Sequence, residues 1–317
     1  MTSRREFVKQ AALGVTAISV PSIAALAAPS PVSVPLAKNV QISLAQWSLH
    51  RALENKEIKA VDFARIAKKE YDISAIEYVN QFYSEMAHSE KFWLQMEQNA
   101  KNEGVRSLLI MVDNEGDLGN PNKAERKTAV ENHYKWIHAA KILGCHSIRV
   151  NAFGDGDKAS IRNNLIDGLG RLATYGAKEN INVIIENHGL HTSDSKFMAG
   201  IIREVNNPYL GTLPDFGNWC LNAKWGSTQN NRCDDVYDRY EGVADFLPFA
   251  KGVSAKSYAF DADGNETIID YRKMLRIVKD SGFKGYIGVE YEGENMPEPE
   301  GIRATKNLIQ KVWKDLG

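Results

Sequence analysis

The sequence predicts an α/β protein in which residues 39–317 fold as one (β/α)8 barrel. Short apolar or β-branched runs alternate with longer amphipathic stretches throughout this region. Successive short runs start roughly 30 to 40 residues apart, which is the length of one strand–helix unit. Eight such units in strict alternation are typical of a single barrel domain of about 250 residues.

The eight expected strands are apolar runs that end in polar residues. They are residues 40–48, 73–80, 105–114, 146–154, 181–189, 209–218, 251–260 and 286–293. Between them, helical periodicity is clear in residues 61–70, 134–144, 165–180 and 271–282. Several of these helical stretches end in Gly or Asn, the residues preferred at helix C-termini.

A doubly wound open sheet is the alternative α/β fold. It usually carries a glycine-rich phosphate loop directly after its first strand. Here the first strand leads into AQWSLHRALE, residues 45–54, which contains no glycine. The sequence also has no G-x-G-x-x-G motif opening a helix and no P-loop, so the barrel is the favoured fold.

Residues 1–27 have the pattern of a twin-arginine signal peptide. The pair Arg4-Arg5 precedes a mildly apolar stretch that ends in an A-x-A cleavage pattern at residues 25–27. A disordered basic N-terminus is the alternative interpretation. Because the apolar stretch is short and interrupted by Pro21, no stable membrane anchor is expected.

The signal pattern predicts a periplasmic or otherwise exported protein, with the twin-arginine translocase as its partner during export. This pathway carries folded proteins, which suits a protein that acquires a metal in the cytoplasm. Residues 28–38 are proline-rich and are expected to form a linker. Cys220 and Cys233 lie in one polar stretch and are able to pair in an oxidising compartment, whereas Cys145 is expected to be buried.

Composition narrows the class of partner. The chain has 317 residues, of which 43% are hydrophobic and 25% are charged, and its formal net charge is −1. These values are ordinary for a globular enzyme and give no reason to expect a nucleic acid or an anionic membrane surface as partner. An oligomer is compatible with the sequence.

Polar residues stand at the end of every expected strand. In a (β/α)8 barrel these ends open onto one face, where active sites lie. The residues are Gln46, Trp47, Glu77, Asp113, Asn114, Arg149, Asn151, Glu186, Asn187, His188, Asp215, Asn218, Ser254, Lys256, Ser257, Glu290 and Glu292. So many polar residues on one rim are not explained by a solvated surface alone.

Three carboxylates from strands five, six and eight are expected to converge at this face. They are Glu186, Asp215 and Glu290. Converging carboxylates repel each other unless a cation lies between them. An oxygen-rich site suits a hard divalent ion, so Mn²⁺ or Mg²⁺ is the expected cofactor. For any one of these residues, a helix cap or a surface ion pair is the alternative role.

The order of these elements resembles the sugar phosphate isomerase/epimerase family, the xylose-isomerase-like TIM barrels, over about residues 40–315. That family typically binds a divalent metal through a Glu after strand five, an Asp after strand six, a His in strand seven and a Glu after strand eight. The segments IIENHG, LPDFGNW and VEYEG match three of these positions. The fourth departs from the pattern, because Ser254 stands where the family has His. Either three protein ligands and water complete the metal site, or His188 does; contact with substrate is the other role open to His188.

The resemblance implies chemistry at a sugar carbonyl. Glu186 and Glu290 would act as metal ligands and as acid–base catalysts that form an enediolate, and Lys256 would stabilise the developing negative charge. The expected substrate-binding residues are Trp47, Glu77, Arg149, Asn151, His188, Asn218 and Trp219. Trp225 is a further candidate for contact with a sugar ring. Packing in the core is the alternative role for each Trp.

Three functions follow from these observations. The first is a metal-dependent isomerase or epimerase of a non-phosphorylated sugar or keto-sugar, since an exported enzyme meets few sugar phosphates. The second is a lyase or hydrolase that uses the same enolisation on oxidised (3-keto) glycosides. The third is a non-catalytic exported sugar-binding protein, which the absent strand-seven His keeps open. An endonuclease, another use of this barrel, is disfavoured by the near-neutral charge and the few histidines.

The export prediction is tested by replacing Arg4 and Arg5 together with lysine. Because the paired arginines are what the twin-arginine translocase recognises, the double variant should accumulate in the cytoplasm. Fractionation followed by immunoblotting measures the distribution. An unchanged periplasmic yield would show that the interpretation of residues 1–27 is wrong.

Overall fold

The structure is a computed structural model that describes residues 40–229 and 233–317. The interpretations of residues 1–27 and 28–38 concern a part of the chain outside the described residues. Residues Asn39–Gly317 form a compact unit of their own. The predicted barrel corresponds to this unit.

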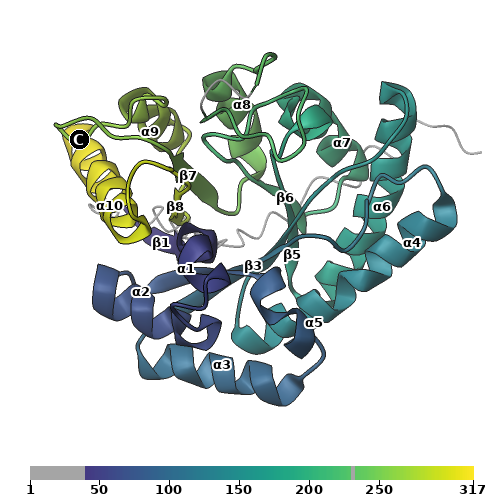
Figure 1. The fold of residues 1–317 in the computed structure, drawn as a ribbon. Helices are drawn as coiled ribbons and strands as arrows, with labels where there is room; N and C mark the ends of the chain where they lie inside the picture. The colour runs from purple at the N-terminus through teal and green to yellow at the C-terminus, as the bar shows by residue number, and fades with distance from the viewer. Residues whose placement is uncertain (1–39, 230–232) are drawn as a thin grey trace, which may run out of the picture. The chain divides into compact units, whose positions relative to one another are not determined.

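Eight parallel strands form the centre of the unit, as the sequence predicts (Figure 1). They are β1 (Ile42–Ala45), β2 (Ala75–Val79), β3 (Arg106–Val112), β4 (Ser147–Val150), β5 (Asn182–Glu186), β6 (Leu210–Leu213), β7 (Val253–Ser257) and β8 (Ile287–Tyr291). Sequential strands pair from β1 to β6, and β8 pairs with both β1 and β7. The backbone N–H of Ser254 donates to the Pro214 carbonyl at 2.9 Å and so joins β7 to the end of β6. The sheet is therefore closed into a barrel.

Helices surround the strands and connect each to the next (Figure 1). They are α1 (His50–Glu54), α2 (Phe63–Tyr71), α3 (Glu90–Asn102), α4 (Lys123–Asn132), α5 (Tyr134–Leu143), α6 (Lys158–Glu179), α7 (Ser195–Val205), α8 (Arg239–Phe246), α9 (Tyr271–Asp280) and α10 (Glu298–Asp315). The four predicted helical stretches are confirmed as α2, α5, α6 and α9. Helix α6 begins earlier than predicted because the Asp157 side chain accepts the Ser160 N–H and caps it.

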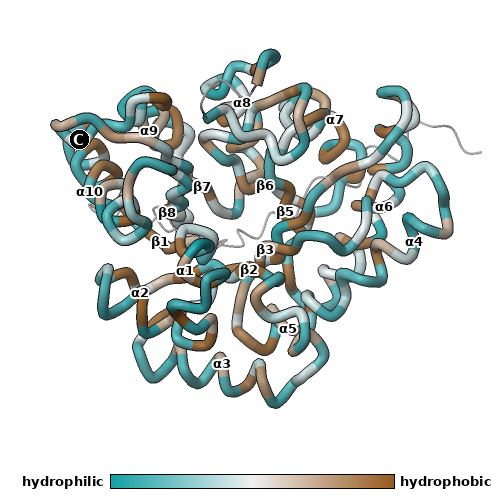
Figure 2. Tube along the Cα trace, viewed as in Figure 1, coloured by the Kyte–Doolittle hydropathy of each residue, from teal (hydrophilic) through white to brown (hydrophobic). Residues whose placement is uncertain are grey.

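The core has two layers. Most buried apolar residues lie between the strands and the helices, where the strands are hydrophobic in Figure 2. A smaller cluster fills the inside of the barrel and consists of Ala45, Val79, Leu109, Met111, Ile184 and Leu213. Because the strands are parallel, the polar residues at their carboxyl ends are collected at one mouth of the barrel.

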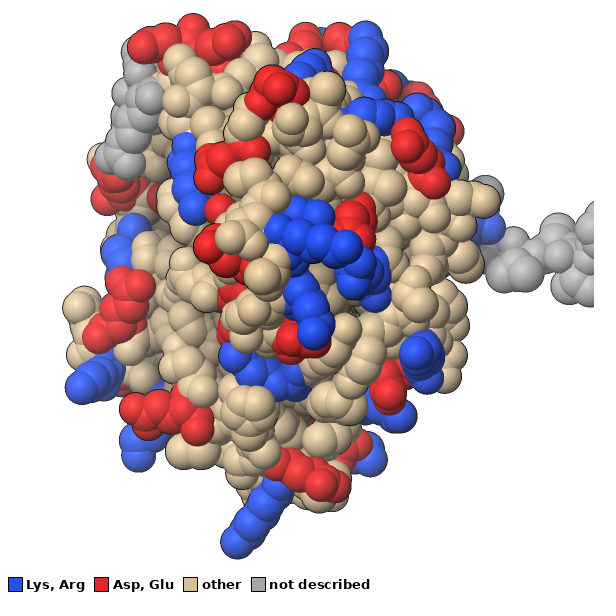
Figure 3. All heavy atoms as spheres, turned by 90° about the vertical axis from the view of Figure 1, so that its right-hand side faces the viewer, with Lys and Arg blue, Asp and Glu red and all other residues tan. Residues whose placement is uncertain are grey.

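The outer surface carries charges of both signs. On the face turned to the viewer in Figure 3, acidic and basic side chains are interspersed. Ion pairs such as Arg171 with Asp167 within α6 and Lys158 with Asp194 contribute to this mixture. No helix among the described residues is both long and apolar enough to cross a bilayer.

Two glycines in α6 give a matched test of packing. A Cβ at Gly168 would lie 2.0 Å from the Leu118 carbonyl oxygen, whereas a Cβ at Gly170 would have only Val205 as neighbour, at 3.8 Å. Gly168→Ala should therefore lower the free energy of unfolding by about 1–3 kcal/mol. Gly170→Ala should raise it by about 0.5–1 kcal/mol, because Ala favours the helix. Urea unfolding of both variants measures the difference, and equal effects would contradict the predicted close approach.

Candidate active site

Three carboxylates meet at the mouth of the barrel, as the sequence predicts. Glu186 ends β5, Asp215 follows β6, and Glu290 lies in β8; all three are buried. One oxygen of each lies within 4.8 Å of the others, so the three are placed to hold one ion. Their meeting follows from the parallel order of the strands, which brings the ends of β5 to β8 to one side.

Asp215 is held by a tight set of hydrogen bonds. Its Oδ1 accepts the backbone N–H groups of Gly217 at 2.7 Å and Asn218 at 2.8 Å. The Asn187 amide donates to the carbonyls of residues 215 and 218, and its oxygen accepts the Asp215 N–H. Burial nevertheless raises the pKa of Asp215 to about 6, against the opposing effect of Lys256. The turn after β6 thus fixes the carboxylate in one orientation.

Ser254 of β7, at the position where the family has His, links two of the three carboxylates. Its Oγ lies 2.6 Å from Asp215 Oδ2 and 2.6 Å from Glu290 Oε2. A hydroxyl carries one proton and can donate it to only one of these oxygens at a time. Ser254 therefore serves here as a hydrogen-bond bridge and contributes no nitrogen ligand.

Lys256 lies two residues further along β7 and points to the same side of the strand. Its Nζ is 3.1 Å from Glu290 Oε1, 3.0 Å from Glu292 Oε1 and 3.8 Å from Asp215 Oδ2. Burial would lower the pKa of Lys256, but these carboxylates outweigh it and raise the pKa well above its ordinary value. Burial by itself would raise the pKa of Glu290. The charge of Lys256 and the hydrogen bond from Ser254 outweigh burial, so the pKa of Glu290 is lowered. The pair is a buried, charged contact beside the carboxylate cluster.

Arg149 of β4 supplies the second cation. Its Nη1 donates to Asp113 Oδ1 at 2.5 Å. Its Nε lies 2.8 Å from Glu186 Oε2, but the two atoms are not aligned for a hydrogen bond, and neither has another partner. Burial is the main cause that raises the pKa of Glu186 well above its usual range, and Arg149 opposes it. Glu186 Oε2 is therefore a buried oxygen that is ion-paired with Arg149 and accepts no hydrogen bond.

His188 belongs to a chain of polar groups next to Arg149. The Asn151 amide donates to Asp113 Oδ1 at 2.6 Å, and its oxygen lies 2.7 Å from His188 Nδ1. Because that amide oxygen only accepts, His188 Nδ1 carries the proton and Nε2 is left as an acceptor. Burial, with Arg149, lowers the pKa of His188 well below its ordinary value. In the part of the chain that the structure describes, the group of possible metal ligands contains Glu186, Asp215 and Glu290 but not His188.

The charge balance shows that these residues fit a divalent cation. Among the residues that the structure describes, two cations, Arg149 and Lys256, form ion pairs with the carboxylates of the cluster. Those carboxylates are Glu186, Asp215, Glu290, Asp113 and the partly buried Glu292. The carboxylates outnumber these cations, and the oxygens of Glu186, Asp215 and Glu290 are the kind of donor that a hard divalent ion prefers.

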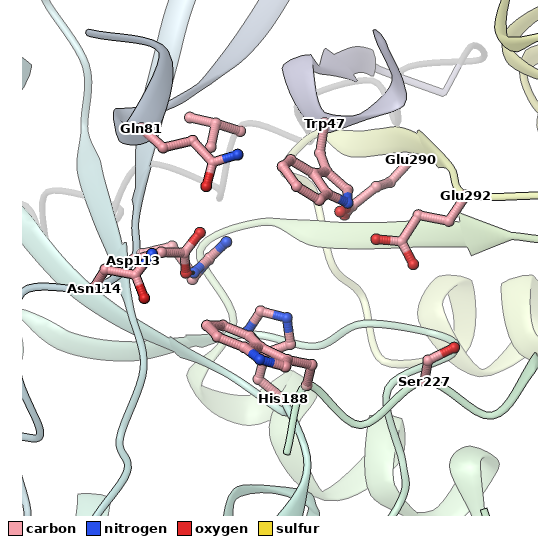
Figure 4. A pocket seen from close by; sticks show the side chains of 11 residues that line it. Trp47, Gln81, Asp113, Asn114, His188, Ser227, Glu290 and Glu292 are labelled. Atoms are coloured by element: carbon pink, nitrogen blue, oxygen red, sulfur yellow. Dashed lines mark hydrogen bonds and ion pairs between the residues drawn. The ribbon is translucent and has the colours of Figure 1, made fainter. Parts of the chain in front are cut away.

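A cavity of about 310 Å³ opens above the cluster. Its lining is formed by Trp47, Val79, Gln81, Asp113, Asn114, Arg149, His188, Trp225, Ser227, Glu290 and Glu292. In Figure 4, Trp47, Glu290 and Glu292 lie on one side of the cavity, with Asp113 and Asn114 across from them. A flat aromatic ring facing carboxylates and amides is the type of lining that binds a sugar.

Most of the predicted site residues are found around this cavity. Trp47, Arg149, His188 and Glu290 line it directly. Asn218 donates its amide N–H to Glu186 Oε1 at 3.3 Å, so it orients a carboxylate and does not line the cavity.

Trp219 and Glu77 lie elsewhere. Trp219 was predicted to contact substrate, but its ring is fully buried and packs against Tyr237 and Phe246. The lack of a side chain at Gly242 makes room for this ring. Glu77 points into the barrel interior, where Ser43 Oγ donates to its Oε1 at 2.5 Å and its Oε2 has no hydrogen-bond partner. The structure thus places both side chains outside the cavity lining.

Other lining residues come from segments without periodicity. Gln81 lies in the 3-10 helix Asn80–Met86 that follows β2, and Ser227 lies in the segment after β6. The same segment contains Trp225, and it is closed by a disulfide between Cys220 and Cys233. The two cysteines are the pair that the sequence indicated as able to form a disulfide. Cys145 is buried and free, as predicted.

Comparison with known proteins agrees with the resemblance. The chain belongs to the xylose isomerase-like TIM barrel family, which it matches over residues 63–312. No curated protein sequence matches the chain.

Solved structures with the same fold include sugar epimerases. The 3-keto-D-glucoside 4-epimerase YcjR from E. coli is 13% identical, with a TM-score of 0.63, and the match covers 86% of this chain and 99% of that chain. A D-tagatose 3-epimerase-like protein is 15% identical, with a TM-score of 0.65 and coverage of 87% and 98%. The IOLI protein, solved with a zinc atom, is 12% identical, with a TM-score of 0.65 and coverage of 88% and 99%. At these identities the likeness establishes the fold.

The buried Glu77 predicts a pH-dependent stability. Burial raises the pKa of Glu77 from 4.5 to about 7, so the folded state holds a proton that the unfolded state releases. The protonated Glu77 carboxyl makes its full contribution to the free energy of unfolding below about pH 4.5, and this contribution is lost as the pH rises towards 7. Glu77→Gln should therefore be more stable than the wild type at pH 8, by on the order of 2–3 kcal/mol, and close to it at pH 4. Urea unfolding at both pH values measures this, and a difference that is the same at both would contradict the assignment.

Proposed function

We propose that this protein is a divalent-metal-dependent isomerase or epimerase that acts on a non-phosphorylated sugar or keto-sugar. One observation carries the proposal: Glu186, Asp215 and Glu290 converge within 4.8 Å beneath a cavity with an aromatic wall, and Lys256 lies against them. Membership of the xylose isomerase-like family and the sugar epimerases among the structural neighbours support it.

The three carboxylates would hold the metal, and Mn²⁺ or Mg²⁺ fits their oxygen atoms best. The zinc atom in one structural neighbour shows that the fold also accommodates a softer ion. A divalent ion here supplies Lewis acidity towards a sugar carbonyl and its neighbouring hydroxyl. Because Ser254 contributes no nitrogen ligand, the donors available at this cluster are mainly oxygens.

The residues around the cluster have separate tasks in proton transfer. Glu186 and Glu290 are the acid–base pair: one removes the proton next to the sugar carbonyl and the other returns a proton. Lys256 provides a fixed positive charge beside Glu290, where negative charge develops on the substrate oxygen. Asp113 and His188 offer hydrogen bonds to sugar hydroxyls from the opposite wall, and Trp47 offers an apolar face to the ring.

The charges of the cavity favour a substrate without phosphate. Asp113, Glu290 and Glu292 all line it, whereas Arg149 is the one cation in the lining and is already bound to Asp113. A phosphate dianion would face three carboxylates in this cavity. This preference agrees with the proposed export of the chain.

Two other functions remain as outcomes of the same test. A lyase or hydrolase acting on 3-keto glycosides would use the same proton removal and then expel a leaving group. The neighbouring 3-keto-D-glucoside 4-epimerase makes a keto-glycoside a reasonable substrate for such a test. A non-catalytic binding protein would bind sugar and catalyse no exchange.

Exchange of substrate hydrogen in D₂O tests the proposal. With Mn²⁺ present, NMR over a panel of sugars and 3-keto-sugars should show exchange at one carbon. Glu186→Gln and Glu290→Gln should abolish it. Lys256→Met should reduce the rate by a factor of about 100 or more, as for the loss of one oxyanion donor, and should leave the metal content unchanged.

Circular dichroism and metal analysis of each variant serve as controls for folding and metal binding. If Glu186→Gln or Glu290→Gln retained near wild-type exchange, that residue would not be the acid or base. Sugar binding without exchange in the wild type would favour a binding protein over an enzyme.

A further inference from the structure

A second cavity, of about 230 Å³, lies beside the one above the carboxylates. Both cavities have Asn114 and Trp225 in their walls. The second cavity is formed by residues that follow β3 and β4, among them Glu115 and Phe153, and by Lys224. It does not include the three carboxylates of the candidate metal site.

We propose that the second cavity is a subsite for the second sugar ring of a disaccharide or other glycoside, whose first ring occupies the cavity above the carboxylates. This inference rests on the proposed function and adds its substrate class. A free monosaccharide would fill only the first of the two cavities. A glycoside is long enough to place one ring in each and to cross the shared wall at Trp225.

Trp225 lines both cavities and contacts aromatic side chains of each. Its ring lies edge-on to His188 at 5.0 Å and to Phe153 at 5.7 Å, measured between ring centroids, and 42% of the residue is exposed. The backbone of Trp225 has a φ of 72°, a conformation that a bulky residue adopts at a cost of about 1–2 kcal/mol. Residues in such sparsely populated backbone conformations cluster at active and ligand-binding sites, and the surrounding structure must hold them there.

The structure around Trp225 supplies that restraint. Gly189 forms an antiparallel bridge with Lys224, and a Cβ at Gly226 would lie 2.5 Å from the Gly189 nitrogen, so the two segments touch. The Cys220 N–H donates to the Gly226 carbonyl at 3.1 Å, and Cys220 is bonded to Cys233. The ring is thereby fixed between the two cavities without being buried.

The second cavity combines an aromatic surface with polar groups, as sugar sites do. Lys224 Nζ lies 4.5 Å from the centre of the Phe153 ring and 5.5 Å from that of Trp225. Glu115 is engaged by Lys135 at 2.8 Å and by the Trp136 Nε1–H at 2.6 Å, so it is a fixed acceptor. Donors and acceptors therefore surround an apolar face.

The charges favour a neutral second ring over an anionic group. Glu115 and Asp117 both line the cavity, and Lys224 is the one Lys or Arg among its lining residues. A phosphate or carboxylate arm would meet the carboxylate of Asp117 and that of Glu115, whose charge is partly offset by its pairing with Lys135. The hydroxyl groups of a sugar are able to donate to those same carboxylates.

The two cavities are also connected through side chains. Asn151 lines the second cavity and bonds to Asp113 and His188, which both line the first. A ligand group that binds Asn151 from the second cavity therefore acts on the hydrogen bonds that orient the wall of the first. This connection gives the second ring a route to influence how the first ring is held.

Calorimetric titration of the purified protein with Mn²⁺ present tests the subsite. The probes are glucose, methyl β-glucoside, cellobiose, maltose and trehalose. At least one disaccharide should bind about tenfold or more tighter than glucose and methyl β-glucoside. Lys224→Ala, which alters the second cavity, should reduce the ratio of disaccharide to monosaccharide affinity about fivefold or more. Gln81→Ala is the matched change in the first cavity. It should weaken the binding of disaccharides and monosaccharides alike and leave the ratio of the two affinities unchanged.

Different results overturn different conclusions. If the protein exchanges hydrogen on monosaccharides but binds disaccharides no more tightly, the proposed subsite alone would be wrong. A protein that prefers disaccharides and exchanges no hydrogen on any sugar would overturn the proposed enzyme and support the subsite. If Lys224→Ala left the affinity ratio unchanged, or if none of the probes bound, the second cavity would not be the subsite.

Discussion

The site depends on burying three carboxylates at the mouth of one barrel. The three carboxylate oxygens lie within 4.8 Å of one another, so each pair of ionised groups repels by at least about 3 kcal/mol if the effective dielectric constant is near 20. The closed sheet supplies the compensating stability, because its strand pairing and its two apolar layers do not depend on these side chains. Lys256 and Arg149 offset part of the repulsion, and the remainder is what makes a bound divalent ion favourable.

Ser254 changes how that repulsion is relieved. A His ligand would bring a nitrogen to the metal, whereas the Ser254 hydroxyl brings one proton to two carboxylates. Positive charge next to these carboxylates comes from Lys256, the buried cation that contacts Glu290 and Glu292. The departure from the family pattern is therefore compatible with chemistry at this site, because the cluster retains its three carboxylates and a fixed cation next to them.

The sequence alone predicted the repeated strand–helix units of the molecule. Strand and helix periodicity reports which face is buried, so the eight strands and the carboxylates at their ends could be assigned from pattern alone. Trp219 was misassigned because an aromatic residue next to a strand end has the same local signature whether it faces the cavity or the core. What decides its position is Gly242, which is distant in sequence and leaves space for the ring. Glu77 shows the same limit: its strand was correct, but its pairing with Ser43 depends on the register of two strands.

Two different kinds of interaction hold the two parts of the cavity wall: strand pairing for one and a disulfide-closed loop for the other. The carboxylates, Lys256 and Arg149 lie in or directly after strands. The hydrogen bonds between neighbouring strands fix the register of the sheet and with it the positions of these residues. Trp225 and Ser227 lie in the segment after β6, where a disulfide closes a short loop and two glycines allow close contact between backbones. Closing a loop of this length contributes roughly 3 kcal/mol by restricting the unfolded chain. The loop that carries Trp225 and Ser227 can therefore change without moving the strand residues that hold the carboxylates in place.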